Sequence, residues 1–238
     1  MLRAERGAVM GCLICGKPLV YFKTPAQKTC RACGGTFSAD AQCLQGHYVC
    51  DACHAKGAGD VARAVCRASK SRDPYEIALE IMRAPSVHMH GPEHHVIVGA
   101  ALVTAYRNAG GTAEPLEKLL DTVDKRGKKV PGGTCGFWGA CGSALGAGIF
   151  LSAATGATPL SGESHGLCNR LTARCLAAIG EVGGPRCCKR NLALAIRETV
   201  AFTRENLGVD MAAGEIVCEF YDNNKECIGA RCPFRAAK

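Results

Sequence analysis

Cysteine constrains this chain more than any other residue type, because 17 of its 238 residues are cysteines. A chain of this length can bury a hydrophobic core and does not need disulfides merely to fold. The first ten residues contain no apolar run long enough for a secretory signal, so we expect a cytoplasmic protein with reduced thiols. In that setting, closely spaced cysteines bind metal ions or take part in chemistry.

Two Cys-x-x-Cys-Gly motifs near the N-terminus predict metal binding. Each such turn brings two thiolates to one ion, and its glycine relieves crowding of the backbone. A second group of cysteines with one histidine follows within twenty residues. We therefore predict two zinc ions in a small zinc-ribbon or treble-clef-like module over residues 1–58. The predicted ligands are Cys12, Cys15, Cys30, Cys33, Cys43, His47, Cys50 and Cys53.

The spacing of these ligands allows two wirings. In a sequential arrangement, the sites are Cys12/Cys15/Cys30/Cys33 and Cys43/His47/Cys50/Cys53. In a cross-braced arrangement, they are Cys12/Cys15/Cys43/His47 and Cys30/Cys33/Cys50/Cys53. Cross-bracing is typical of RING-type ligases, but the histidine here falls in the third ligand pair, with Cys43, which departs from the ligand order of that family. The sequence leaves the wiring open.

Beyond residues 55–60 the apolar pattern becomes helical and predicts a mainly α, bundle-like domain over residues 59–238. Asp73-Pro74 predicts a capped helix start, with Glu76 completing a capping box. The run from Val96 to Tyr106 is apolar on all sides and predicts a central helix. Val130–Gly162 has no charged residue, but its nine glycines favour close helix packing over a membrane span. Further helices are expected over 115–125, 139–156, 166–180 and 185–207.

Four of the seven histidines fall within eight residues, at the expected start of the central helix. Neutral imidazole binds zinc or iron, and Glu93 could act as a ligand or a general base. We therefore predict a metal or acid–base site here, formed by His88, His90, Glu93, His94 and His95. The segment is similar to the His-x-His-x-Asp-His run of metallo-β-lactamase hydrolases, with one extra residue and Glu93 replacing the aspartate. A capped helix start with solvated histidines is the simpler alternative.

Seven cysteines of the predicted helical domain fall in loops that are marked by glycine or proline. We expect Pro185 to start a helix whose dipole, with neighbouring cations, lowers the thiol pKa of Cys187 and Cys188. These two, with His94 and Glu93, are the predicted catalytic residues. Cys66, Cys168 and Cys175 fall within expected helices and are interpreted as small core residues. An iron–sulfur cluster is predicted among Cys135, Cys141, Cys187, Cys188, Cys218, Cys227 and Cys232.

Several of these motifs together resemble an uncharacterised family of cysteine-rich proteins. They are Cys-x-x-Cys-Gly and the segments Gly46–His54, Met89–His95, Pro131–Gly142 and Gly183–Arg190. We associate this domain-of-unknown-function family with anaerobic bacteria and archaea, where it is sometimes joined to methyltransferase domains. Separately, Trp138–Phe150 resembles the cysteine-glycine-alanine helices of a redox-active, iron–sulfur-associated family. The resemblance implies oxygen-sensitive metal chemistry and supplies no reaction.

We therefore expect a metalloprotein in redox, sulfur-transfer or one-carbon chemistry, acting on a small-molecule substrate or with a redox partner protein. One alternative is a zinc- or iron-dependent hydrolase centred on residues 88–95. Another is a zinc-finger module that binds RNA or protein, with the helical domain as scaffold. The first seventy residues have a formal charge of +6, which zinc-bound thiolates reduce to about +3. This charge gives only weak support for nucleic-acid binding.

Overall fold

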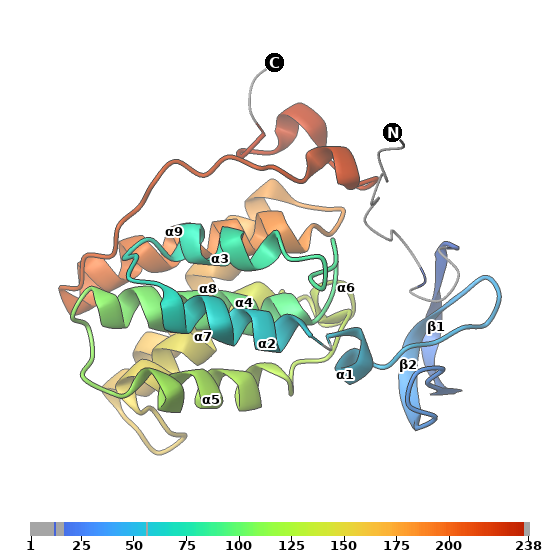
Figure 1. The fold of residues 1–238 in the computed structure, drawn as a ribbon, viewed down its shortest axis with the longest axis horizontal. Helices are drawn as coiled ribbons and strands as arrows, with labels where there is room; N and C mark the ends of the chain where they lie inside the picture. The colour runs from blue at the N-terminus through green and yellow to red at the C-terminus, as the bar shows by residue number, and fades with distance from the viewer. Residues whose placement is uncertain (1–11, 13–16, 56, 236–238) are drawn as a thin grey trace.

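The computed structural model describes residues 12, 17–55 and 57–235. Within these residues, one two-stranded antiparallel sheet precedes nine α-helices. The predicted mainly α fold with a small N-terminal β module is therefore confirmed in outline. The sheet lies at one end of the molecule, beside the helices (Figure 1).

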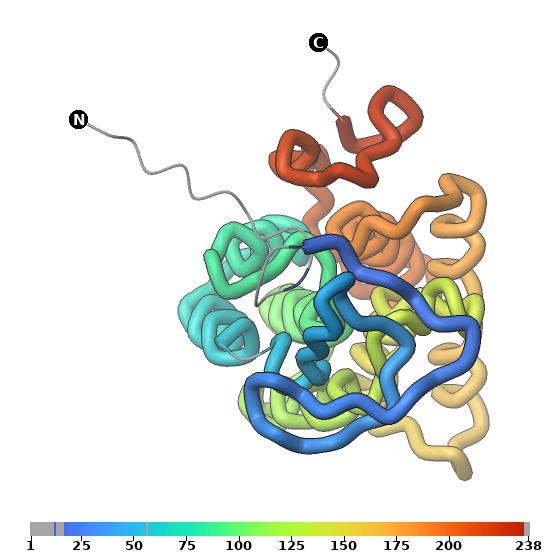
Figure 2. Tube along the Cα trace, turned by 90° about the vertical axis from the view of Figure 1, so that its right-hand side faces the viewer, coloured from blue at the N-terminus to red at the C-terminus, as the bar shows by residue number. Residues whose placement is uncertain are grey.

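The hairpin consists of β1 (Leu19–Thr29) and β2 (Thr36–Cys43), whose register is irregular between Tyr21 and Ala26. Most of its residues are exposed or half-buried, so it has little hydrophobic core of its own. The short helix α1 (Asp51–His54) follows. Figure 2 views the molecule from the side of the hairpin, with the helices behind it. An isolated two-stranded hairpin is marginally stable in water, so further interactions must hold this region together.

The remaining helices form a layered bundle, here called the helical body. Two 3-10 turns, at Tyr221–Asn223 and Gly229–Arg231, follow its last helix. The helices are α2 (Ala58–Ala68), α3 (Pro74–Met82), α4 (Glu93–Asn108), α5 (Leu116–Gly127), α6 (Thr134–Phe137), α7 (Gly142–Thr155), α8 (Glu163–Val182) and α9 (Cys188–Leu207).

Helix α4 lies at the centre of the body and packs against α2, α3, α5, α7 and α9. Thirteen of its sixteen residues are buried, as the apolar run from Val96 to Tyr106 predicts. Close packing depends on Gly99, where a Cβ atom would lie 2.7 Å from the Val123 side chain. The first turn of this buried helix carries Glu93, His94 and His95, which fixes these polar side chains inside the protein.

Two predicted helix starts differ from the structure in detail. Asp73 caps α3 as expected, accepting hydrogen bonds from the N–H groups of Tyr75 and Glu76. Glu76 does not complete a capping box by accepting from the Asp73 N–H directly. Instead, the Ser71 hydroxyl accepts from the Asp73 N–H and donates to the Glu76 carboxylate. Helix α9 begins at Cys188, with Cys187 as its N-cap. Arg190 donates to the carbonyls of Gly183 and Pro185, which holds this segment as a loop.

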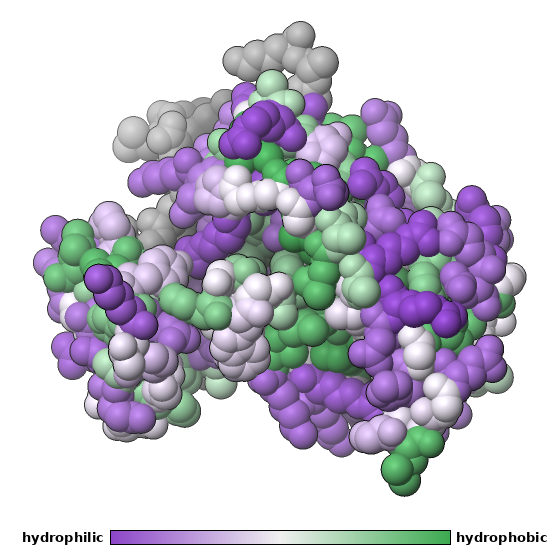
Figure 3. Space-filling view, turned by 180° about the vertical axis from the view of Figure 1, so that it is seen from behind, coloured by the Kyte–Doolittle hydropathy of each residue, from purple (hydrophilic) through white to green (hydrophobic). Residues whose placement is uncertain are grey.

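After α9 the chain crosses back over the helices towards the start of α9 (Figure 1). Hydrogen bonds fasten this C-terminal segment to the region around α3, from Ala212 N–H to the Arg72 carbonyl and from the Tyr75 hydroxyl to the Val217 carbonyl. Figure 3 shows that hydrophilic residues cover much of the rear face, with apolar patches between them. Among the described helices, none combines the length and apolarity that a membrane span requires.

Candidate metal centres

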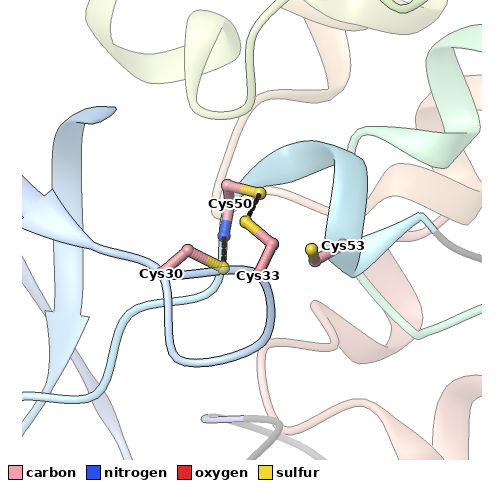
Figure 4. Close-up of side chains that lie close together, drawn as sticks. All are labelled: Cys30, Cys33, Cys50 and Cys53. Atoms are coloured by element: carbon pink, nitrogen blue, oxygen red, sulfur yellow. Dashed lines mark hydrogen bonds between the residues drawn. The ribbon is translucent and has the colours of Figure 1, made fainter. Parts of the chain in front are cut away.

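Four cysteines of the hairpin region converge on one point, at the end of the hairpin that faces α1 (Figure 4). The sulfur atoms of Cys30, Cys33, Cys50 and Cys53 all lie within 4.8 Å of one another. The Sγ atoms of Cys33 and Cys50 are 3.8 Å apart. A tetrahedral ion with Zn–S bonds of about 2.3 Å separates its sulfur ligands by about 3.8 Å. This group could hold a metal ion such as zinc, and it corresponds to the cross-braced wiring.

Local backbone geometry holds these sulfurs in place. Gly34 follows the Cys30–Cys33 turn with a φ of +74°, and the Cys50 N–H donates to the Cys30 sulfur at 3.3 Å. Burial raises the pKa of the Cys30 thiol, but N–H donors, led by that of Cys50, lower it to about 6. A hydrogen bond with the Cys50 sulfur raises the pKa of Cys53 to about 12. A divalent cation would displace the remaining thiol protons on binding.

The second hairpin group contains Cys12, Cys43 and His47, whose ligand atoms also lie within 4.8 Å of one another. The Cys12 sulfur is 3.8 Å from Nδ1 of His47. The Cys43 sulfur accepts hydrogen bonds from the N–H groups of Gln45 and His47 at 3.3 and 3.2 Å. The predicted fourth ligand, Cys15, lies outside the described residues. The three described members match the other half of the cross-braced wiring.

The histidines of residues 88–95 separate into different environments. Nε2 of His90 is 3.0 Å from a Glu226 oxygen, Nδ1 of His94 is 3.1 Å from the Gly91 carbonyl, and Nδ1 of His95 is 3.1 Å from the Val130 carbonyl. Burial lowers the pKa of His94 to about 3, so its ring is neutral. The structure therefore does not bring all the predicted ligands of this segment together.

Instead, His88 and Glu93 meet His54, a residue that the sequence does not single out. Nδ1 of His54 and Nδ1 of His88 each lie 3.3 Å from a different oxygen of the Glu93 carboxylate. Burial raises the pKa of Glu93, but hydrogen bonds from His54 and His88 outweigh it and hold that pKa well below its ordinary value. The only sequence signal for His54 is its position next to Cys53.

Four of the seven predicted cluster ligands line one pocket at the start of α9: Cys187, Cys218, Cys227 and Cys232. The Cys187 sulfur accepts hydrogen bonds from the Arg190 N–H at 3.4 Å and from the Asn224 amide at 3.6 Å. The Phe220 N–H donates to the Cys218 sulfur at 3.4 Å. The C-terminal segment provides three of these cysteines, so its path back across the helices assembles the pocket.

The other three predicted ligands, Cys135, Cys141 and Cys188, do not line this pocket. The Cys141 sulfur accepts a hydrogen bond from the Asn191 amide at 3.4 Å, and Cys135 is exposed. The expectation of lowered thiol pKa values at the start of α9 is wrong. Burial raises the pKa of Cys187 and raises that of Cys188 to about 12, because desolvation outweighs the helix dipole and the neighbouring cations.

The three remaining cysteines of the body fit their predicted role as small core residues. Cys66 and Cys175 are fully buried, and Cys168 is half-buried. The Cys66 and Cys175 sulfurs each donate to a helix carbonyl, that of Ala100 and that of Ala195. Burial raises the pKa of Cys66 to about 11 and that of Cys175 to about 12. Both are therefore neutral thiols at physiological pH.

Comparison with known proteins identifies one family. The model of a family of unknown function (DUF5714) matches residues 62–235, which are 174 of the 238 residues. The match contains His88, Glu93 and the four pocket cysteines, whereas both hairpin groups and His54 precede it. Neither the curated proteins nor the solved structures yielded a match.

Proposed function

The chain belongs to the family of unknown function DUF5714, and we propose that it is a metalloprotein whose four-cysteine pocket binds an iron–sulfur cluster. In this proposal a double-zinc module over residues 1–58 is joined to a helical, cluster-binding domain over residues 59–238. The cluster would exchange electrons with a small-molecule substrate or a redox partner protein, in redox, sulfur-transfer or one-carbon chemistry. The observation that carries the proposal is the convergence of Cys187, Cys218, Cys227 and Cys232 on one pocket.

The pocket sulfurs are not arranged as the ligands of a single ion. Among the described residues, no three of these four cysteines have sulfurs within 4.8 Å of one another, unlike the hairpin cysteines. A lone zinc ion needs sulfurs about 3.8 Å apart. An iron–sulfur cluster places iron and sulfide between its cysteine ligands and therefore suits a wider set of thiolates.

The charges around the pocket also favour an anionic group. Lys189 and Arg190 line the pocket and are 5% and 4% exposed. Neither forms an ion pair with a carboxylate in the described part of the chain. Desolvation lowers the pKa of Lys189 to about 8. Buried cations need a compensating negative charge, which a cluster held by thiolates would supply.

Hydrogen bonds to the sulfurs would tune such a cluster. The N–H groups of Arg190 and Phe220 and the amide of Asn224 already point at Cys187 or Cys218. Donors of this kind reduce the negative charge on ligating sulfur and shift the reduction potential of a cluster. These residues would therefore set the potential at which the protein accepts or donates an electron.

The test is anaerobic reconstitution of the full chain with iron and sulfide, followed by absorption spectroscopy. The variant Cys227→Ser removes one pocket sulfur, and Cys168→Ser is the matched control because Cys168 is half-buried outside the pocket. We expect a visible sulfur-to-iron absorption band in the unmodified protein and in Cys168→Ser, and its loss in Cys227→Ser. An equally strong band in Cys227→Ser, or no band in the unmodified protein, would overturn the proposal.

A further inference from the structure

Three side chains from separate segments meet where the hairpin region contacts the helical body. His54 ends α1, His88 lies in the loop before α4, and Glu93 is the first residue of α4. Their ligand atoms all lie within 4.8 Å of one another. We propose that His54, His88 and Glu93 bind a third metal ion, a single divalent transition-metal ion, distinct from the hairpin sites and the cysteine pocket.

The distances within this group also fit ligands of a single ion. Each histidine Nδ1 lies 3.3 Å from its Glu93 oxygen. A charged N–H···O hydrogen bond is normally about 2.7–2.9 Å long. Metal–ligand bonds of about 2.1 Å in tetrahedral geometry separate nitrogen and oxygen ligands by about 3.4 Å.

The surroundings form a built site around these ligands. The Glu93 side chain is 2% exposed, and the His88 N–H donates to its Oε1 atom at 3.1 Å, which fixes the carboxylate. A Cβ atom at Gly91 would lie 2.0 Å from Glu93 Oε2 and 2.5 Å from the His54 ring. Only glycine at position 91 therefore lets the backbone pass this close to the ligands.

The ligand set leaves coordination positions for an external molecule. His54 and His88 have side chains that are 21% and 23% exposed, so one side of the site is open to solvent. Two imidazoles and one carboxylate with open positions are typical of catalytic zinc and non-haem iron(II) centres. This set differs from the closed four-cysteine site, and it would bind water or a small substrate oxygen directly to the ion.

The third site is coupled to the hairpin zinc site through α1. Cys50 caps this helix, Cys53 lies within it, and His54 is its last residue. An ion bound by Cys50 and Cys53 would fix α1 and so orient His54 towards Glu93. This coupling rests on the proposed zinc binding by the hairpin, whereas the ligand set of the third site does not.

Anaerobic titration of the full-length, metal-stripped chain with cobalt(II) tests the proposal. Cobalt bound by thiolates absorbs strongly through sulfur-to-metal charge transfer, whereas cobalt bound by imidazole and carboxylate shows only weak d–d bands. We expect His88→Gln and Glu93→Gln to bind one cobalt ion fewer than the unmodified chain, with the thiolate bands unchanged. His165→Gln is the matched control, since His165 is exposed on α8, and it should bind as much cobalt as the unmodified chain.

The outcomes separate this inference from the proposed zinc sites. Equal cobalt binding by the unmodified chain and by His88→Gln, with thiolate bands present in both, would overturn the third site alone. The His88 side chain is partly exposed, so this variant tests the site even where Glu93→Gln disturbs folding. An unmodified chain without thiolate bands would instead overturn the two zinc sites. Loss of the weak d–d component in Cys53→Ser would support the coupling through α1.

Discussion

The Sγ atom of Cys33 lies 3.8 Å from that of Cys50, which follows it by 17 residues along the chain. This contact joins the turn between the two strands to the start of α1. The hairpin itself is largely exposed, so little apolar burial stabilises this arrangement. A metal ion shared by these sulfurs would supply the missing stability, as in other small domains without a core of their own.

Substituting Cys33, Cys50 or both should therefore lower the zinc content by the same amount. In the cross-braced arrangement, Cys33→Ser, Cys50→Ser and the double variant each lose the same single zinc ion. Zinc analysis of the purified proteins measures this directly, with Cys168→Ser as the control. A double variant that loses two ions would indicate sequential wiring, because Cys33 and Cys50 would then belong to different sites.

Stability should fall as the pH drops below neutrality because of His94. This ring is fully buried, and desolvation lowers its pKa from 6.5 to about 3. Between these values the unfolded chain binds a proton that the folded chain does not, so acid favours unfolding. Urea unfolding at pH 7 and pH 5.5 measures the effect, and His94→Gln should lose less stability than the unmodified chain over this interval. Equal losses in both proteins would contradict the assignment.

Removing the cap of α3 should destabilise the body. The Asp73 carboxylate accepts from the N–H groups of Tyr75 and Glu76 and also from that of Gly214, so it holds the C-terminal segment as well. Asp73→Ala should therefore lower the free energy of unfolding by about 1 kcal/mol or more. Urea denaturation tests this against Asp60→Ala, which changes an exposed first-turn acid of α2. Matching midpoints for the two variants would count against the cap.

Two thiols with raised pKa values should resist alkylation in the folded protein. Burial raises the pKa values of Cys175 and Cys188 to about 12, and only a thiolate attacks iodoacetamide at a useful rate. Mass spectrometry after labelling at pH 8 should find both residues unmodified until denaturant and chelator are added. Rapid labelling of Cys188 in the native, metal-free protein would restore its predicted role as a reactive nucleophile.

The sequence predicts those features that depend on residues close together along the chain, and it misses those that depend on distant ones. Helix α4 is predictable because its own residues are apolar on all sides. The start of α9 is not, because the guanidinium of Arg190 holds the Pro185 loop in a way that local propensity does not encode. His54 escapes notice for the same reason, since its partner Glu93 lies 39 residues further along the chain.

For the pocket cysteines, the sequence predicts the candidates but not which of them come together. The sequence singles them out as candidate ligands through the number of cysteines and the glycines and prolines of their loops. Which four converge depends on the return of the C-terminal segment, fixed by contacts such as that between Tyr75 and Val217. Separations of this length along the chain leave no periodic pattern in the sequence.

The most direct test of the central claim is the metal and sulfide content of the full chain purified without oxygen. We predict iron and acid-labile sulfide in equal amounts, together with zinc, and a visible chromophore. Zinc alone, with neither sulfide nor chromophore even after reconstitution, would contradict the claim that the pocket of Cys187, Cys218, Cys227 and Cys232 binds an iron–sulfur cluster.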